Sequence, residues 1–199
     1  MTIRSLFATR LYDAVIDDAS LLADLEQSCR LFATEDRAGA AWSKAKGYRG
    51  YTSYASLNDL PTRDPAFADL RKALDKHVRA FAEALHLDLH RKLKLDSLWV
   101  NVMKSGGTHS GHLHPHSVIS GTFYVTLPEG SGGLKLEDPR LPLMMAAPPR
   151  REDAPEDSQS FVYVDPRPGM LLLWESWLRH EVPASTAKGE RISISFNYS

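Results

Sequence analysis

The sequence predicts a mainly β domain with helices in its first half, and three observations lead to this expectation. The composition changes near residue 92, from helix-favouring Ala and Leu to Val, Ile, Gly and aromatic residues. After residue 93, short apolar runs alternate with turns that contain Gly and Pro, a pattern typical of a β sandwich or barrel. The chain has 199 residues, of which 43% are hydrophobic and 25% charged, and this fits one globular domain.

Residues 1-92 are expected to form a helix-rich N-terminal support. Asp64 and Pro65 have the residue types of an N-cap followed by the first position of a helix. Apolar residues then follow at steps of three or four, which predicts an amphipathic helix with one buried face: Phe67, Leu70, Leu74, Val78, Phe81 and Leu85. A second, weaker helix is predicted from Leu22 to Phe32, with Cys29 in the core.

Residues 93-199 are expected to form the β-rich half. The predicted strands are Leu98–Met103, Val118–Leu127, Gly133–Leu136, Phe161–Val164, Met170–Trp174 and Arg191–Tyr198. The stretch Pro139–Asp157 contains several prolines and has no periodicity, so it is predicted to be a long loop between strands. In the first half, Gly47–Tyr54 is rich in Gly and Tyr, which indicates either a turn packed on the core, the interpretation we favour, or a binding loop.

Charge and cysteine content narrow the partners and the compartment. The net charge is -1 and the basic residues are scattered, so nucleic acid is not an expected ligand. The apolar run Met170–Trp174 is far shorter than a membrane-spanning helix, so no membrane association is expected. Cys29 is the single cysteine and no leader pattern is seen, which favours a cytoplasmic protein. If the chain forms a homo-oligomer, a dimer is the expected form.

Four of the eight histidines lie between positions 109 and 116. On an extended segment, residues i and i+2 face the same side, so His112 and His114 can direct imidazole nitrogens at one metal ion. The alternative is that these imidazoles are exposed or satisfied by hydrogen bonds. His116 has the same parity but follows Pro115, whose fixed φ favours a change of chain path. His116 and His109 are therefore assigned to the surroundings of the metal or to the substrate pocket.

A third candidate ligand, His180, precedes a turn-like segment that is followed by Arg191. If this turn closes an antiparallel hairpin, His180 and Arg191 lie close together on neighbouring strands. Arg191 and Ser193 alternate with Ile192 and Ile194, so the guanidinium and the hydroxyl face one side. A buried guanidinium there would bind a carboxylate, either that of a ligand or that of an Asp or Glu side chain.

These motifs resemble those of the 2-oxoglutarate- and Fe(II)-dependent oxygenases, specifically a bacterial and phage branch with a His-x-His pair. The resemblance covers roughly residues 97-198. The matching segments are Trp99–Asn101, His112–Pro115, Ser120–Val125, Pro168–Met170, Trp177–His180 and Arg191–Ser193.

The resemblance implies a double-stranded β-helix core, also called a jelly roll and similar to that of the cupins, with the N-terminal helices packed on one sheet. It implies Fe(II) bound by three ligands, His112, His114 and His180, and 2-oxoglutarate as cosubstrate. Arg191 would pair with the distal carboxylate of 2-oxoglutarate, Ser193 would assist, and Tyr124 would line the pocket; the expected neighbours of the metal or substrate also include Asn101 and Trp174. The reaction would hydroxylate a small molecule or a protein side chain, with oxidative decarboxylation of 2-oxoglutarate.

The sequence departs from the usual pattern of the superfamily, in which two histidines and one carboxylate bind the iron. His114 stands at the position of that carboxylate. One alternative keeps a carboxylate ligand, taken from Glu137, Asp138 or Glu175. Two further alternatives are a three-histidine zinc or cupin-like metalloenzyme and a non-catalytic jelly-roll module that binds a ligand.

Overall fold

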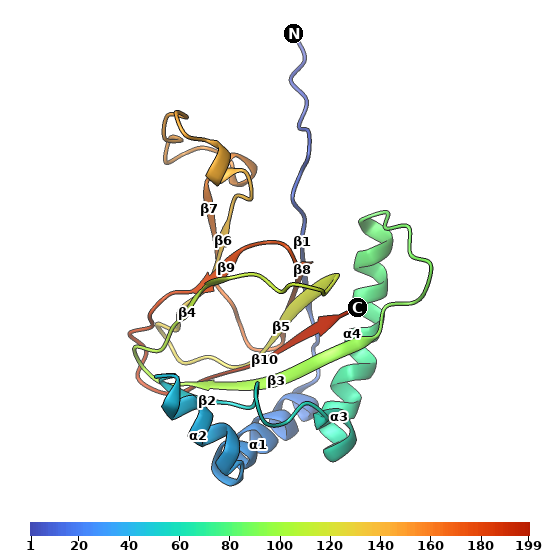
Figure 1. Ribbon diagram of the computed structural model, residues 1–199, viewed down its shortest axis with the longest axis vertical. Coiled ribbons are helices and arrows are strands. Elements are labelled where there is room, and N and C mark those ends of the chain that lie inside the picture. The colour runs from blue at the N-terminus through green and yellow to red at the C-terminus, as the bar shows by residue number, and fades with distance from the viewer.

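The computed structural model describes residues 1-199 as two antiparallel β-sheets, with helices packed against one of them (Figure 1). The larger sheet has six strands in the order β1-β8-β5-β10-β3-β2, and the smaller has four in the order β4-β9-β6-β7. Their bounds are β1 Leu11–Val15, β2 Gly50–Thr52, β3 Leu95–Met103, β4 His109–His112, β5 Ile119–Thr126, β6 Leu134–Glu137, β7 Phe161–Val164, β8 Met170–Glu175, β9 His180–Val182 and β10 Arg191–Tyr198.

The helices lie in the first half of the chain, as the composition predicts. They are α1 Ala19–Glu35, α2 Arg37–Ala45, α3 Leu60–Arg63 and α4 Pro65–Ala84. The Asp64 carboxylate accepts the backbone N–H of Ala66, and Pro65 is the first residue of α4, so the predicted start of this helix is confirmed. The weaker predicted helix is also present as α1, and Cys29 is buried in the core. No helix combines the length and the apolar character needed to cross a bilayer.

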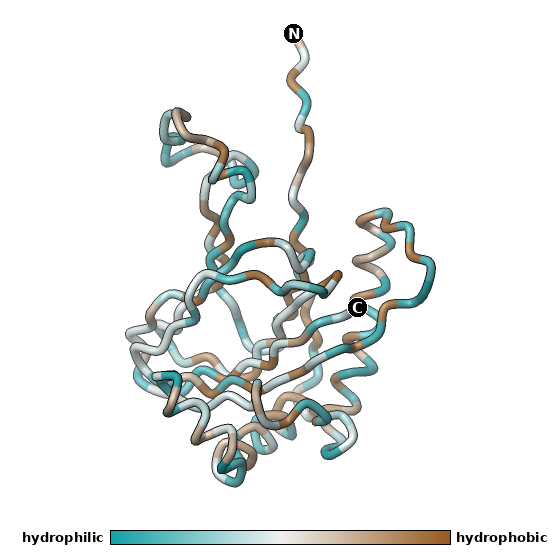
Figure 2. Tube along the Cα trace, in the orientation of Figure 1, coloured by the Kyte–Doolittle hydropathy of each residue, from teal (hydrophilic) through white to brown (hydrophobic).

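The main core lies between the helices and the outer face of the larger sheet. Its buried side chains come from α1, α4 and the strands, and include Leu70 and Leu74 of α4 and Ile192 and Ile194 of β10. Hydrophobic and hydrophilic residues alternate along the helices, as Figure 2 shows. Burial of one apolar face by each of the two long helices, α1 and α4, explains why the helical half packs on one sheet, as expected from the resemblance.

A second, smaller core fills the space between the two sheets. Tyr124 and Trp174 project into it from the larger sheet, whereas Leu134, Leu136 and Val182 project from the smaller one. Successive residues of a strand point to opposite faces, so the strands of the larger sheet send apolar side chains to the helices and other side chains to the inside. The space between the two sheets is therefore where a site can form.

All six predicted strands are present, with small differences at their ends. The predicted loop Pro139–Asp157 lies in the connection between β6 and β7, which contains two short 3-10 turns, Leu141–Leu143 and Glu156–Ser158, and projects from the sheets (Figure 1). The shorter elements were not predicted from the sequence: β1, β2, β4, β9, α2 and α3. Strands of three to five residues carry too few alternating positions for their periodicity to be recognised.

The predicted hairpin between His180 and Arg191 is wrong. β9, which starts at His180, belongs to the smaller sheet and pairs with β4 and β6. β10, which starts at Arg191, belongs to the larger sheet and pairs with β3 and β5. Since both edges of β10 are occupied by these neighbours, no edge remains for β9, and residues 183-190 instead carry the chain from one sheet to the other.

Asp36 connects α2 to the segment that contains β2. Its carboxylate accepts the backbone N–H of Gly39 at 2.9 Å, which caps α2, and also the hydroxyl groups of Tyr51 and Ser56. Burial acts to raise the pKa of the Asp36 carboxyl, but the hydrogen bonds from Gly39, Ser56 and Tyr51 outweigh it and keep this pKa below its usual value. One ionised carboxylate thus holds β2 and its flanking residues against the helix.

We expect Asp36→Ala to lower the free energy of unfolding by about 2–3 kcal/mol at neutral pH, because it removes a helix cap and the acceptor of the Tyr51 hydroxyl, and leaves the Ser56 hydroxyl only the carbonyl of Ser53. A carboxyl with a lowered pKa stabilises the fold above its unfolded pKa, so the difference from wild type should begin to shrink below about pH 4 and should continue to shrink as the pH falls through the lower pKa of the folded state. Urea denaturation at several pH values measures it. Asp59→Ala, which removes only an exposed ion pair with Arg63, is the matched control and should cost less than about 1 kcal/mol. Equal losses for the two variants would contradict this role of Asp36.

Candidate active site

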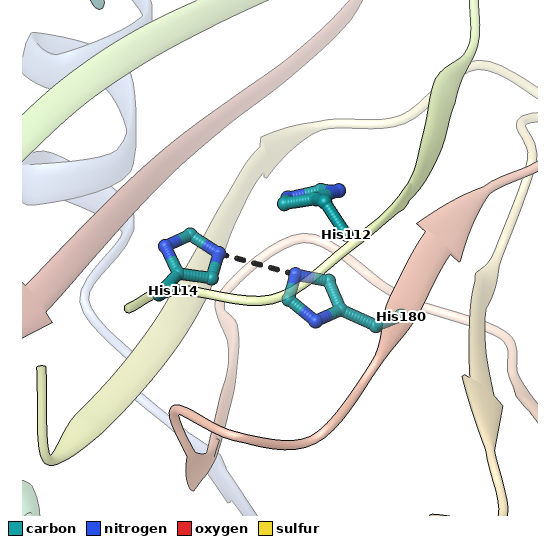
Figure 3. Close-up of side chains that lie close together, drawn as sticks. All are labelled: His112, His114 and His180. Atoms are coloured by element: carbon teal, nitrogen blue, oxygen red, sulfur yellow. Dashed lines mark hydrogen bonds between the residues drawn. The ribbon is translucent and has the colours of Figure 1, made fainter. Parts of the chain in front are cut away.

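Three histidines meet between the sheets, and Figure 3 shows their rings facing one another. His112 ends β4 and His180 begins β9, and the two residues are directly opposite each other in the pairing of these strands. His114 follows two residues after β4, where its backbone N–H donates to the carbonyl of Ser176 at 3.0 Å. One ring nitrogen from each histidine lies within 4.8 Å of those of the other two.

Backbone carbonyls fix the orientation of two of the rings. The Nδ1 atom of His112 lies 2.7 Å from the carbonyl oxygen of Ser110, and that of His180 lies 2.9 Å from the carbonyl oxygen of Leu178. Because a carbonyl only accepts, Nδ1 of each ring carries the proton and Nε2 keeps its lone pair. Metal-binding histidines are commonly held in this way.

The separation of the ring nitrogens fits a shared metal ion. The Nε2 atoms of His114 and His180 are 3.3 Å apart. Two nitrogens that each lie about 2.1 Å from one ion, with tetrahedral or octahedral angles, are roughly 3.0–3.4 Å from each other. Burial lowers the pKa of His114 to about 4 and that of His180 to about 3, so both rings are neutral at neutral pH, which is the form that binds metal.

The cluster contains no carboxylate. Glu137 pairs with Arg179 at 3.3 Å and Asp138 pairs with Arg140 at 2.8 Å, and neither carboxylate belongs to the cluster of three imidazoles. Glu175, at the end of β8, is also outside the cluster. The alternative in which one of these residues replaces a histidine as a metal ligand is therefore not supported by the geometry.

Arg191 lies in the same cleft and has no acidic partner. Its side chain is only 3% exposed, Nη1 donates to Ser193 Oγ at 2.9 Å, and the guanidinium carbon lies 5.1 Å from the ring centroid of Tyr124. No Asp or Glu forms an ion pair with it, which excludes the salt-bridge interpretation. A buried cation without a counter-ion is costly, and a bound carboxylate would offset that cost.

The cleft is a cavity of about 400 Å³ that contains nearly all of the predicted site residues. Its lining includes His109, His112, His114, His180, Arg191, Ser193, Tyr124, Asn101 and Trp174. His116 is the exception and corrects the sequence analysis: it is exposed, has a φ of 72°, and lies outside the cleft. The chain turns away after Pro115, as the fixed φ of that residue favours.

A row of three aromatic side chains, Trp99, Tyr54 and Trp42, extends from the histidines toward the protein surface and is called the aromatic wall below. Of these residues, only Trp99 was singled out from the sequence. The ring of Trp99 stacks on His114 with centroids 5.9 Å apart, Tyr54 contacts Trp99 at 5.3 Å, and Trp42 contacts Tyr54 at 6.0 Å. The tyrosines of Gly47–Tyr54 were the available signal, but the sequence does not show that this segment pairs with the edge of β3 and thereby reaches the cleft. Apart from Arg191, the lining includes no Asp, Glu, Lys or Arg.

Residues 97-197 match the model of a protein family described as "Putative 2OG-Fe(II) oxygenase". The chain belongs to this family. The matched span is half of the chain and includes the three clustered histidines and Arg191. The protein is thus a 2-oxoglutarate- and Fe(II)-dependent oxygenase, and the resemblance found in the sequence is confirmed.

Solved structures of low sequence identity share the fold of this oxygenase. A prolyl-4-hydroxylase from Pseudomonas putida matches with a TM-score of 0.63 and 18% identity, covering 96% of this chain and 92% of that chain. The α-ketoglutarate-dependent epimerase SnoN of nogalamycin biosynthesis matches with a TM-score of 0.65 and 14% identity, covering 96% and 78%. HygX from Streptomyces hygroscopicus, solved with nickel and 2-oxoglutarate, matches with a TM-score of 0.63 and 15% identity, covering 96% and 83%. The core is accordingly a double-stranded β-helix. No curated protein sequence matches the chain.

We expect Arg191→Met to raise the free energy of unfolding of the ligand-free protein by about 1–2 kcal/mol, because it replaces an unpaired buried charge by an apolar chain of similar length. Urea denaturation in the absence of carboxylate buffers measures it. Arg179→Met is the matched control, since it removes a partly exposed ion pair and should change stability by less than about 1 kcal/mol. Clear destabilisation by Arg191→Met would show that the guanidinium is satisfied within the protein.

Proposed function

We propose that this oxygenase binds Fe(II) through His112, His114 and His180 and binds 2-oxoglutarate through Arg191, Ser193 and Tyr124. The observation that carries the proposal is the presence of three clustered imidazoles and one buried guanidinium without a counter-ion in a single cleft. The imidazoles suit a divalent transition metal, and the guanidinium suits a carboxylate.

The groups around Arg191 support its role as the receptor for the distal carboxylate. Ser193 Oγ accepts a hydrogen bond from Arg191 and keeps its own proton available for donation. The hydroxyl of Tyr124 and the Nε atom of Arg191 are buried and have no partner. Burial raises the pKa of Tyr124 although the charge of Arg191 opposes this, so the hydroxyl remains a donor. These groups can donate hydrogen bonds to an anion, and without an anion the Tyr124 hydroxyl and Arg191 Nε have no acceptor.

When bound, Fe(II) and 2-oxoglutarate would supply the oxidising chemistry, with dioxygen as the oxidant: one oxygen atom would enter the hydroxyl group of the product, and the other would enter succinate as 2-oxoglutarate loses carbon dioxide. The protein contributes placement. His112 and His180 are held by backbone carbonyls, Arg191 would orient the cosubstrate, and the aromatic wall would limit access of water to the centre.

A three-histidine zinc hydrolase would use the same imidazoles, but that function would not explain why a buried arginine without a counter-ion, Arg191, lies in the same cleft. With His114 in place of a carboxylate, the ligand shell of the iron carries one negative charge less than the usual one, and this changes the redox properties of the bound metal.

Anaerobically purified protein should contain about one Fe(II) per chain, and titration with 2-oxoglutarate should produce a metal-to-ligand charge-transfer band. His180→Ala should abolish the band, because it removes a ligand. Arg191→Ala should keep the metal but weaken 2-oxoglutarate binding by at least about 30-fold, since it removes the charge partner of a buried carboxylate.

His116→Ala is the matched control, because His116 is exposed outside the cleft, and it should bind metal and cosubstrate like wild type. Stoichiometric zinc without any metal-dependent binding of 2-oxoglutarate would contradict the proposal in favour of a zinc enzyme. Absence of both metal and 2-oxoglutarate binding would favour a ligand-binding module without activity.

The substrate, a small molecule or a protein side chain, is proposed to enter along the aromatic wall and to be uncharged where it approaches the iron. A charged group would lose its hydration there without meeting an opposite charge, because Arg191 is occupied by the cosubstrate. The row of Trp42, Tyr54 and Trp99 leaves no space for a cation between the rings, since neighbouring centroids are 5.3–6.0 Å apart. It offers a surface on which an apolar or ring-shaped face can pack.

Cyclic compounds of matched size that carry a hydroxyl, an ammonium or a carboxylate group test this proposal. We expect the uncharged set to stimulate succinate formation from 2-oxoglutarate more strongly than the other two sets, as measured in a coupled succinate assay. Stronger stimulation by the ammonium or the carboxylate compounds would contradict it.

A further inference from the structure

We infer that Tyr48, which lies outside the family-matched span, completes the 2-oxoglutarate pocket and donates a hydrogen bond to the anion bound by Arg191. This inference rests on the proposed function, because it assumes that Arg191 binds the cosubstrate. It assigns the helical half of the chain a direct part in cosubstrate binding, whereas the family match begins at residue 97.

The backbone on both sides of Tyr48 is fixed. Its N–H donates to the carbonyl of Ser43 in α2 at 2.9 Å, and its own carbonyl accepts the N–H of Gly50 at 3.0 Å. The carbonyl of the next residue, Arg49, accepts the N–H of Lys104 at 2.9 Å. These bonds attach the segment to α2 on one side and to the end of β3 on the other.

The conformation of Gly50 shows that the backbone of the segment containing Tyr48 cannot easily take another course. Its φ is 141°, a value that residues with a side chain rarely adopt, and a Cβ atom there would lie 2.0 Å from the carbonyl oxygen of Val102. The close approach of β2 to β3 therefore requires glycine two residues after Tyr48. The position of the Tyr48 ring is set by the fold rather than by a flexible loop.

The side chain of Tyr48 enters the cleft and ends in a hydroxyl without a partner. The ring packs on the inner core and lies 5.2 Å from the ring of His109. The hydroxyl is buried and forms no hydrogen bond. Tyr48 lines the same cavity as Tyr124 and Arg191. A buried hydroxyl without a partner costs free energy, so its retention indicates a missing ligand atom.

The missing atom is an acceptor, and it belongs to an anion. Burial raises the pKa of Tyr48, with Arg191 opposing the shift, so the hydroxyl keeps its proton and can donate. A carboxylate offers about four lone-pair positions. Arg191 Nε and the hydroxyl groups of Ser193, Tyr124 and Tyr48 provide donors for them, and no Asp or Glu lines the cavity to compete.

Tyr48→Phe removes only the hydroxyl and tests the inference in the Fe(II) protein under anaerobic conditions. We expect the dissociation constant for 2-oxoglutarate, measured by calorimetry, to rise about 10- to 100-fold, the range expected for one hydrogen bond to a charged group. The amount of bound Fe(II) should not change. The melting temperature without 2-oxoglutarate should stay the same or rise, because the hydroxyl has no partner to lose, whereas the increase caused by 2-oxoglutarate should become smaller.

Tyr163→Phe is the matched control, since Tyr163 lies exposed on β7 outside the cleft, and it should behave like wild type in each measurement. Unchanged 2-oxoglutarate affinity in Tyr48→Phe, with wild-type binding intact, would overturn the inference and leave the proposed function standing. A lower melting temperature without 2-oxoglutarate, together with unchanged affinity, would assign Tyr48 a structural role and would equally overturn it. If wild type itself fails to bind 2-oxoglutarate in the presence of Fe(II), the proposed function fails first.

Discussion

The two faces of β10 meet two different environments, and the site depends on this difference. Ile192 and Ile194 are fully buried in the core beneath the helices, and their burial fixes the strand's orientation. Because neighbouring residues on a strand point to opposite sides, Arg191 and Ser193 must then face the cleft. A shift of one residue in the pairing would bury the guanidinium under the helices. The free energy of the apolar core thus holds a charged group in a place that it would not occupy by itself.

The strands and the longer helices could be predicted because each contains several repeats of its period. The alternation Arg191, Ile192, Ser193, Ile194 gave the correct inner and outer faces of β10, and the cap at Asp64 gave the correct start of α4. The proximity of His112 and His114 also followed from local spacing, since the two histidines are two residues apart. Local patterns indicate which face of a helix or strand is buried and where the element begins or ends, and these features were predicted correctly.

Contacts between segments that are distant in the sequence could not be predicted from such local patterns. His180 reaches the cluster because β9 pairs with β4, and Arg191 reaches the cleft through a different sheet, so their closeness comes from two layers rather than from one hairpin. The aromatic wall joins Trp42 and Tyr54 of the first half to Trp99 of the second. Neither pairing is encoded in a sequence period, because each depends on how the layers stack.

The six-stranded sheet takes its two outermost strands, β1 and β2, from the first half of the chain. A fragment limited to residues 93-199 would therefore expose the hydrogen-bonding edges of β8 and β3, together with the apolar sheet face that the helices cover. Open edges beside an uncovered apolar face favour intermolecular strand pairing. We therefore expect the segment that carries the recognisable family motifs to need the first half of the chain for stable folding, since strands from both halves share one sheet and the boundary of the motif match is not a boundary of that sheet.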